Sequence, residues 1–206
     1  MNKIYKLIII LPLVILGCTT NVNKENKFTK KINSLDLNIF SKSGDKKYSI
    51  TSPYSIYDNL EDKFHFKKTT INIFYGGYTK YIINSDESTL SDNNKVLELK
   101  GNVKLKTISK DEDYLYADNF IWNIDETNYL LTGNIRFENK NVILTSAKAK
   151  LGVDNIIEFF NPVKYIIKDN NNNLYETNSE NAYYDINNES LSFKAKEKRV
   201  RSILYF

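Results

Sequence analysis

Hydrophobic and polar residues alternate along most of the chain from residue 34 onward, and no segment there shows the 3.6-residue period of a helix. In the clearest case, residues 97–105, the odd positions are apolar or glycine and the even positions are Glu, Lys or Asn. A strand with this pattern has one dry and one wet face, and a slip of one residue would bury its polar groups. Turn signals rich in Gly, Asp and Asn separate the segments, so the sequence predicts an all-β chain.

The alternating segments recur at a nearly constant spacing. A Tyr or Val followed four positions later by Ser or Asp occurs at Tyr48…Ser52, Tyr81…Ser85, Tyr114…Asp118, Val142…Ser146 and Tyr175…Ser179, in steps of 33, 33, 28 and 33 residues. An apolar-x-apolar pair begins 11 or 12 residues after the Ser or Asp of each motif. Such repeats indicate stacked units, none of which can bury its apolar face alone. We therefore expect two facing antiparallel sheets, built from stacked units with two or three short strands each.

Gly101 and Gly133 occupy equivalent places in two of these segments, each within a Leu-x-Gly-x-(Val/Ile) pattern. A glycine in mid-strand has no side chain to pack and is typical of a bend, a bulge or the close approach of another group. We expect one of these features at both positions.

The N-terminus has the features of a secretion signal. Lys3 and Lys6 precede ten consecutive apolar residues, 7–16, and a helix of that length spans about 15 Å, half of a bilayer core. This indicates a signal-peptide core and not a membrane span. The next residues, Ile-Leu-Gly-Cys at 15–18, resemble a bacterial lipobox, although Leu is commoner than Ile at its first position.

We therefore predict cleavage after residue 17 and lipidation of Cys18, the only cysteine. A thioether-linked diacylglycerol with an amide-linked chain such as palmitate would supply the two or more acyl chains that stable anchoring needs. Residues 18–33 are polar and predict a lipidated tether, and residues 34–206 predict the folded domain.

The composition of the chain excludes several classes of function. Aromatic residues make up 13% of the chain, a bias that favours strands. Removal of a signal that holds Lys3 and Lys6 would lower the net charge from +4 to +2, too weak for a nucleic-acid binder. One Cys and one His exclude a disulfide or a Cys/His metal cluster, so no metal or cofactor is expected. Acidic groups at 86–87, 111–113 and 125–126 are predicted to lie in solvated turns, so no enzyme is expected.

The segment Asn94–Leu105 and the copy Leu131–Phe137 resemble a recurring strand of the lipopolysaccharide-transport proteins, the OstA-like family that includes LptA, LptC and the N-terminal part of LptD. The stretch from Phe40 to Tyr57 is similar to the start of an LptC domain. The resemblance covers roughly residues 35–193, and the lipobox makes this chain a lipoprotein-anchored variant.

This resemblance implies an open, twisted β-jelly-roll with an apolar groove for the acyl chains of lipopolysaccharide. It further implies a non-enzymatic protein at the periplasmic face of the inner membrane. Such a protein accepts lipopolysaccharide from an inner-membrane ABC transporter and passes it to an LptA-like bridge protein. The residues expected to line the groove are Phe64, Phe66, Leu97, Leu99, Val103, Leu105, Tyr129, Leu131, Ile135, Phe137, Ile157, Phe159, Val163 and Tyr165.

The resemblance also assigns the two sheet edges, with the transporter at the N-terminal edge near residues 37–40 and the bridge protein at the C-terminal edge. The residues expected at that second edge are Leu191, Phe193 and Ala195. The basic tail 194–201 either keeps this edge solvated or contacts lipid phosphates.

Several alternatives stay open at this point. The apolar positions could fill a closed core that meets no lipid. The chain could then be an envelope lipoprotein whose β-repeats serve as a scaffold or in adhesion. Two further alternatives are a soluble bridge protein of the same fold and a carbohydrate-active β-sandwich enzyme.

Overall fold

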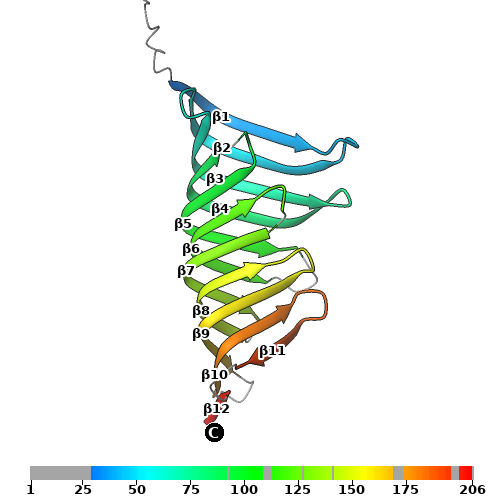
Figure 1. The fold of residues 1–206 in the computed structure, drawn as a ribbon, viewed down its shortest axis with the longest axis vertical. Helices are drawn as coiled ribbons and strands as arrows, with labels where there is room; N and C mark the ends of the chain where they lie inside the picture. The colour runs from blue at the N-terminus through cyan, green and yellow to red at the C-terminus, as the bar shows by residue number, and fades with distance from the viewer. Residues whose placement is uncertain are drawn as a thin grey trace, which may run out of the picture.

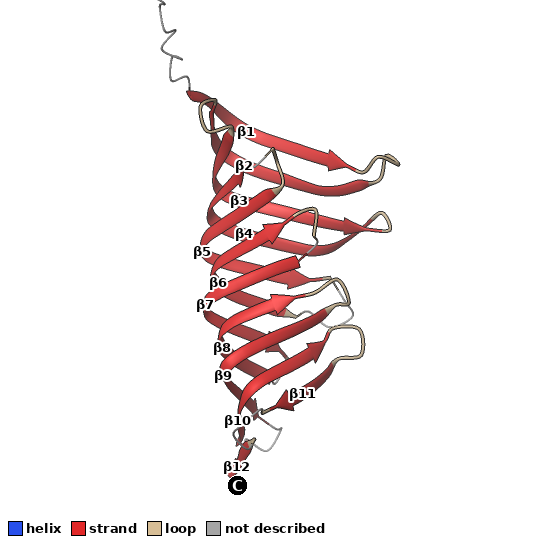
Figure 2. Ribbon diagram, viewed as in Figure 1, coloured by secondary structure: helices blue, strands red, loops and turns tan. Residues whose placement is uncertain are grey.

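The computed structural model describes residues 29–91, 93–108, 113–126, 128–140, 142–168, 174–195 and 200–205. These residues form strands and turns without any helix (Figures 1 and 2), which confirms the all-β prediction. In this part of the chain there is accordingly no helix that is long and apolar enough to cross a membrane. The predicted signal segment and Cys18 lie outside the described residues.

In the described part of the chain, twelve strands follow one another along the longest axis of the molecule (Figure 1). They are β1 (Thr29–Phe40), β2 (Lys46–Asp58), β3 (Lys63–Tyr75), β4 (Tyr78–Ser91), β5 (Val96–Thr107), β6 (Tyr114–Asn123), β7 (Asn128–Asn139), β8 (Val142–Leu151), β9 (Ile156–Lys168), β10 (Leu174–Asp185), β11 (Ser190–Lys194) and β12 (Arg201–Tyr205). Strands β1 to β11 pair in sequence order, and β12 pairs with β10 beside β11. All pairs are antiparallel.

The sequence repeat corresponds to one hairpin of two long strands, such as β4 with β5. The prediction of two or three short strands per unit was therefore wrong in strand length: β2 to β10 have 10 to 14 residues each. The reason is that each strand bends near its middle and then continues, with only a local shift in its pairing, so that what the pattern presents as two short strands is one long strand.

These bends lie at the same level in neighbouring strands. Pairing shifts register between Asn84 and Glu87 and between Lys100 and Val103, and similar shifts follow in later pairs. A bulge adds residues to one strand and turns its direction. The bends divide the sheet into two halves, which we name layer A and layer B. Layer A comprises residues 35–40, 46–51, 69–75, 78–85, 103–107, 114–117, 135–139, 142–146, 163–168, 174–179 and 201–205, and layer B comprises 29–33, 54–58, 63–67, 87–91, 96–100, 119–123, 128–132, 148–151, 156–160, 181–185 and 190–194.

Layers A and B face each other across the core. The rings of Tyr48 in β2 and Trp122 in β6 have centroids 4.9 Å apart, although β2 and β6 are four neighbours apart in the sheet order. In a flat sheet that separation would be about 19 Å. The sheet is therefore folded over itself, so that layer A of one strand faces layer B of strands farther along the chain. The two predicted facing sheets are the two halves of one continuous sheet.

Gly101 and Gly133 sit at two of the bends, with φ angles of 75° and 77°. These are left-handed conformations that favour glycine. A hypothetical Cβ on Gly133 would lie 2.5 Å from Oδ2 of Asp118, and one on Gly101 would lie 2.9 Å from Oδ2 of Asp86. The asparagine after each glycine donates a hydrogen bond to the same aspartate, at 2.7 Å for Asp86 and 2.8 Å for Asp118. The prediction of a bend, a bulge or a close approach is confirmed, because both positions combine a bulge with the close approach of an aspartate.

The acidic groups are placed differently from one another. Asp86 and Glu87 lie within β4 at its bend and not in a turn, which corrects the sequence prediction. The reason is that Asp86 accepts the hydrogen bond that closes the bulge, while Glu87 pairs with Lys67 on the outer surface. Asp125 lies in the β6–β7 turn as predicted, and residues 111–112 are outside the described residues. Asp113 is not in a solvated turn: it is buried just before β6, because its carboxylate accepts hydrogen bonds from Asn139 and from the hydroxyl of Tyr184, which corrects the prediction.

The folded region begins earlier than the expected boundary at residue 34. Strand β1 starts at Thr29, because Thr29 to Asn33 pair with residues 54–58 of β2. These five residues are mostly polar and exposed. Backbone hydrogen bonds to β2 place them in the sheet, and such bonds cannot be recognised from a hydrophobic pattern.

Candidate functional site

The space between the two layers is a continuous apolar interior. Twelve of the fourteen predicted groove residues are buried there, while Phe64 and Tyr165 are partly buried and pack against the same cluster. The buried twelve are Phe66, Leu97, Leu99, Val103, Leu105, Tyr129, Leu131, Ile135, Phe137, Ile157, Phe159 and Val163. The structure therefore brings all fourteen together in one cluster, and their contact with lipid stays a prediction.

Cross-strand pairing arranges the interior side chains in rows that run along the molecule. One row of layer B passes from Phe64 in β3 to Leu191 in β11 without a gap. Its members are Phe64, Leu90, Leu97, Trp122, Tyr129, Leu151, Ile157, Tyr184 and Leu191. Sequence reasoning missed the contributions of β4, β8 and β10, namely Leu90, Leu151 and Tyr184. Their short period-two patterns, such as Ala182-x-Tyr184, were the available signal.

A cavity of about 340 Å³ opens between the two layers on the side away from the bends, and we name this opening the mouth. Its walls come from the β3–β4 hairpin and the start of β2 on one side, and from the β6–β7 and β8–β9 turns on the other. The lining residues are Lys47, Tyr48, Ile73, Phe74, Tyr75, Lys80, Tyr81, Trp122, Ile124, Tyr129, Gly152, Val153 and Asn155. Six of these thirteen residues are aromatic, so the cavity offers flat apolar surface with two ammonium groups.

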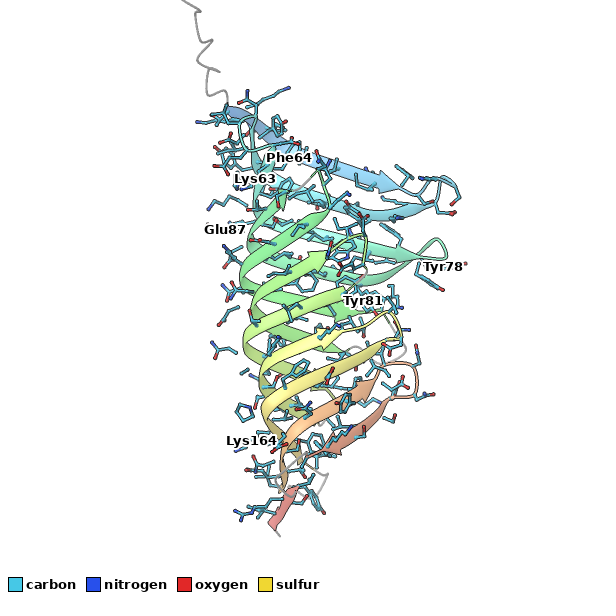
Figure 3. The ribbon with its side chains drawn as sticks, viewed as in Figure 1. Lys63, Phe64, Tyr78, Tyr81, Glu87 and Lys164 are labelled. Carbon is cyan, nitrogen blue, oxygen red and sulfur yellow. The ribbon has the colours of Figure 1, made fainter. Side chains whose placement is uncertain are left out.

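Polar side chains bridge the layers at this mouth. Lys80 of β4 donates a hydrogen bond from Nζ to Oδ1 of Asn155 in the β8–β9 turn, and the Tyr81 hydroxyl donates to the same oxygen at 3.1 Å. Asn155 donates in turn to Asn187, at 3.1 Å. Burial lowers the pKa of Lys80 and raises the pKa of Tyr81. Figure 3 labels Tyr81 near this mouth and Tyr78 at the outer tip of the β3–β4 hairpin.

A second polar bridge lies farther along the same opening. Asn139 at the end of β7 donates to the hydroxyl of Tyr184 in β10 at 3.0 Å, and it also donates to Asp113. The Tyr184 hydroxyl donates to Oδ2 of Asp113 at 3.4 Å. Burial, followed by the charge of Asp113, raises the pKa of Tyr184. Side-chain packing and these two bridges therefore hold the layers together along their open side.

The sheet ends in exposed edges at both termini. β1 pairs only with β2, so its other side is free along the described chain. At the far end, β11 covers residues 181–185 of β10 and β12 covers residues 174–178. The predicted edge residues Leu191 and Phe193 lie in β11, where Phe193 packs against Tyr165, whereas Ala195 lies just beyond it. Sequence reasoning missed β12, which continues this edge over layer A.

Metal binding finds no support in the described residues, where no three His, Cys, Asp or Glu side chains are grouped to hold an ion.

Residues 16–149 match the protein family described as "Lipopolysaccharide-assembly, LptC-related". A search of curated proteins gives no match. A solved structure of LptH from Pseudomonas aeruginosa, the LptA-homologous periplasmic component of its lipopolysaccharide transport device, is similar with a TM-score of 0.39 and 10% identity. The match covers 77% of this chain and 94% of LptH.

Proposed function

Because the chain belongs to the LptC-related family of lipopolysaccharide-assembly proteins, we propose that it is the anchor component of the lipopolysaccharide-transport bridge at the periplasmic face of the inner membrane. It accepts lipopolysaccharide from an inner-membrane ABC transporter and passes it to an LptA-like bridge protein. Membership in this family makes the chain a non-enzymatic component of lipopolysaccharide transport, as the sequence predicted.

The observation that supports this proposal is the unbroken apolar interior along the stacked strands. An acyl chain of about a dozen carbons loses about 0.8 kcal/mol per CH₂ when it leaves a membrane, or roughly 10 kcal/mol in total. Rows of apolar side chains that run the length of the molecule offset most of this cost. No catalytic residue is needed, because the lipid changes its surroundings and not its covalent structure.

Lipid uptake by this route requires the layers to separate. The interior side chains of Leu99 and Phe137 are at most 1% exposed, so acyl chains must replace contacts between the layers. The two polar bridges, centred on Asn155 and Tyr184, would open in the same step. The strands join the layers covalently at the bends, which all lie on the opposite side, so the open side can widen while the bends stay in place.

Photo-crosslinking tests the proposal directly. A photoreactive residue at Leu99 or Phe137 should capture lipopolysaccharide, because both side chains point into the interior. The same probe at Lys100 or Arg136, the adjacent positions on the outer face, should capture at least about tenfold less. Cells that carry each variant are irradiated, and the adducts are detected by a lipopolysaccharide-specific blot. Similar yields from both pairs of sites would contradict the proposal.

The anchor is proposed to be the lipidated Cys18. About ten residues separate it from Thr29, where β1 begins, and ten residues span at most about 35 Å at full extension. The sheet would therefore stand close to the membrane. Mass spectrometry of the protein from its native membrane should give residues 18–206 plus diacylglycerol and one further acyl chain. An uncleaved or unmodified chain would show that the anchor is of another kind, and a Cys18→Ala variant supplies the unlipidated reference.

The second candidate is an envelope lipoprotein with a scaffold or adhesion role. The tight burial of the interior favours it, because a permanently closed core would never meet lipid. Absence of lipopolysaccharide capture at both Leu99 and Phe137, in a protein shown to be folded, would select this candidate.

A further inference from the structure

Lys80 is a partly buried cation without a carboxylate partner. It takes part in none of the ion pairs among the described residues, and its one polar contact there is the neutral amide oxygen of Asn155. Its ammonium also lies 5.1 Å from the ring centroid of Tyr75 and 5.3 Å from that of Tyr81. Burial of an ammonium group without an anion is unfavourable, so this position is suited to a negatively charged ligand.

One residue that lines the same cavity carries a buried hydrogen-bond donor without a partner in the described chain. The side chain of Trp122 is 3% exposed, and its indole N–H has no partner among the described residues. Buried donors without a partner are rare in folded proteins. The rings of Tyr48 and Tyr129 lie against it, with centroids 4.9 Å and 5.5 Å away. Burial raises the pKa of each of these tyrosines to about 12.

The rim of the cavity is apolar and exposed. Tyr75 of the β3–β4 hairpin is 76% exposed and Val153 of the β8–β9 turn is 69% exposed, so the two sides of the opening present apolar surface to solvent. The volume of about 340 Å³ lies at the lower end of the range for ligand sites. An acyl chain fits such walls, whereas a fully polar ligand would leave the aromatic surface unused.

We propose that this mouth cavity is a head-group site for a phosphate-bearing acyl lipid, in which Lys80 holds the phosphate and the Trp122 indole N–H donates to the carbonyl at the head of an acyl chain. The chain then extends from the mouth into the space between the layers. The identity of the natural lipid rests on the proposed function. The mouth cavity adds the place where the polar end of that lipid is held and the two side chains that hold it. A lipid so bound competes with Asn155 for the Lys80 ammonium and weakens the bridge between the layers.

Trp122 itself reports on the cavity, because it is the only tryptophan of the chain. The probe is a short-chain phosphatidic acid with bromine atoms on its acyl chains, which quench indole fluorescence on contact. The reference is a diacylglycerol with the same brominated chains and no phosphate. We expect the full-length protein to bind the phosphatidic acid about tenfold more tightly, as one charge-assisted hydrogen bond would give.

Variants then assign that preference to Lys80. Lys80→Met, which keeps the length of the side chain, should abolish the tenfold preference, and Lys80→Arg should retain it. Lys100→Met, which removes an exposed lysine from the outer face of β5, is the matched control and should also retain it. A structural role of Lys80 alone would lower stability without changing the preference between the two lipids. Equal quenching by both lipids in the unmodified protein, or equal losses in Lys80→Met and Lys100→Met, would overturn the proposal.

Inorganic phosphate separates a lipid site from a simple anion site. It lacks the acyl chain, so it should displace the brominated phosphatidic acid only at concentrations at least about a hundredfold higher. Displacement at equal concentration would contradict the lipid site. Lipopolysaccharide capture at Leu99 is measured in parallel. Capture without a phosphate preference would reject this inference and leave the transport function intact, whereas a phosphate preference without capture would do the reverse.

Discussion

Replacement of Gly133 by alanine is expected to lower the free energy of unfolding by about 3 kcal/mol. An L-residue in the left-handed region costs roughly 1–2 kcal/mol, and Gly133 has a φ of 77°. A Cβ there would also lie 2.9 Å from Cβ of Asp118. Rotation of the aspartate side chain cannot relieve this contact, because its Cβ is fixed by the backbone of β6. Overpacking of this kind adds roughly 1–3 kcal/mol, and for a domain of this size the total corresponds to a melting temperature lower by about 10 °C.

Two other glycines make this a graded test. Gly76 has a φ of 58° in the β3–β4 turn and nothing within 4 Å of its hypothetical Cβ. Gly76→Ala therefore isolates the cost of the backbone conformation, about 1 kcal/mol. At Gly101 the nearest Cβ, that of Asp86, lies 3.3 Å away, so Gly101→Ala should fall between the other two. Urea unfolding followed by circular dichroism gives the three values. Equal losses in all three variants would mean that the contact with Asp118 carries no energy.

The sequence was sufficient to predict the all-β class, the repeat and the buried face of the odd strands. Period-two alternation is clearest in β5, where four of the six even positions are charged, and it is visible in β7, where five of the six even positions are polar. The even-numbered strands were harder, because β4 and β6 carry Asp86 and Asp118 at their bends and Ser85 and Ala117 beside them. These small and acidic residues interrupt the apolar pattern, although they make the tight bend possible.

The mouth cavity could not be predicted from the sequence. Its two walls come from segments about 75 residues apart, such as Lys80 and Asn155, and no local pattern links them. Their meeting depends on the offset between the layers, by which β4 faces the turn after β8. That offset follows from the bend and twist of every strand in between. The edge strand β12 was missed for another reason: five residues beside a basic segment give too short a pattern, and pairing with β10 decides their structure.

Replacement of Phe193 by proline is expected to weaken capture of an LptA-like bridge protein at least about a hundredfold. In the proposed function, the partner adds a strand to the C-terminal edge and continues the apolar interior. β11 forms the layer B half of that edge. Proline removes a backbone donor and distorts the strand, and the loss of about three backbone hydrogen bonds at about 1 kcal/mol each gives a hundredfold weaker complex. Pull-down with a purified bridge protein measures the effect.

A matched variant separates the contribution of the Phe193 side chain to bridge binding from that of the backbone. Phe193→Ala removes the same packing against Tyr165, whose ring centroid is 5.3 Å away, but keeps the backbone N–H. It should retain most of the bridge binding. If Phe193→Ala weakens binding as much as Phe193→Pro, the aromatic contact and not the edge is responsible. The comparison is valid only if the two variants have nearly identical circular dichroism spectra and melting temperatures.

The opposite edge supplies the reciprocal test. Leu37 lies in β1, which pairs only with β2, so Leu37→Pro disturbs the N-terminal edge and leaves β11 untouched. It should lose association with the ABC transporter and keep the bridge protein, whereas Phe193→Pro should do the opposite. This double dissociation follows from the geometry, because nine strands of a continuous sheet separate β1 from β11 and a local distortion at one end does not reach the other. Loss of both partners in either variant would mean that the two edges do not act separately, and the assigned direction of transfer would be wrong.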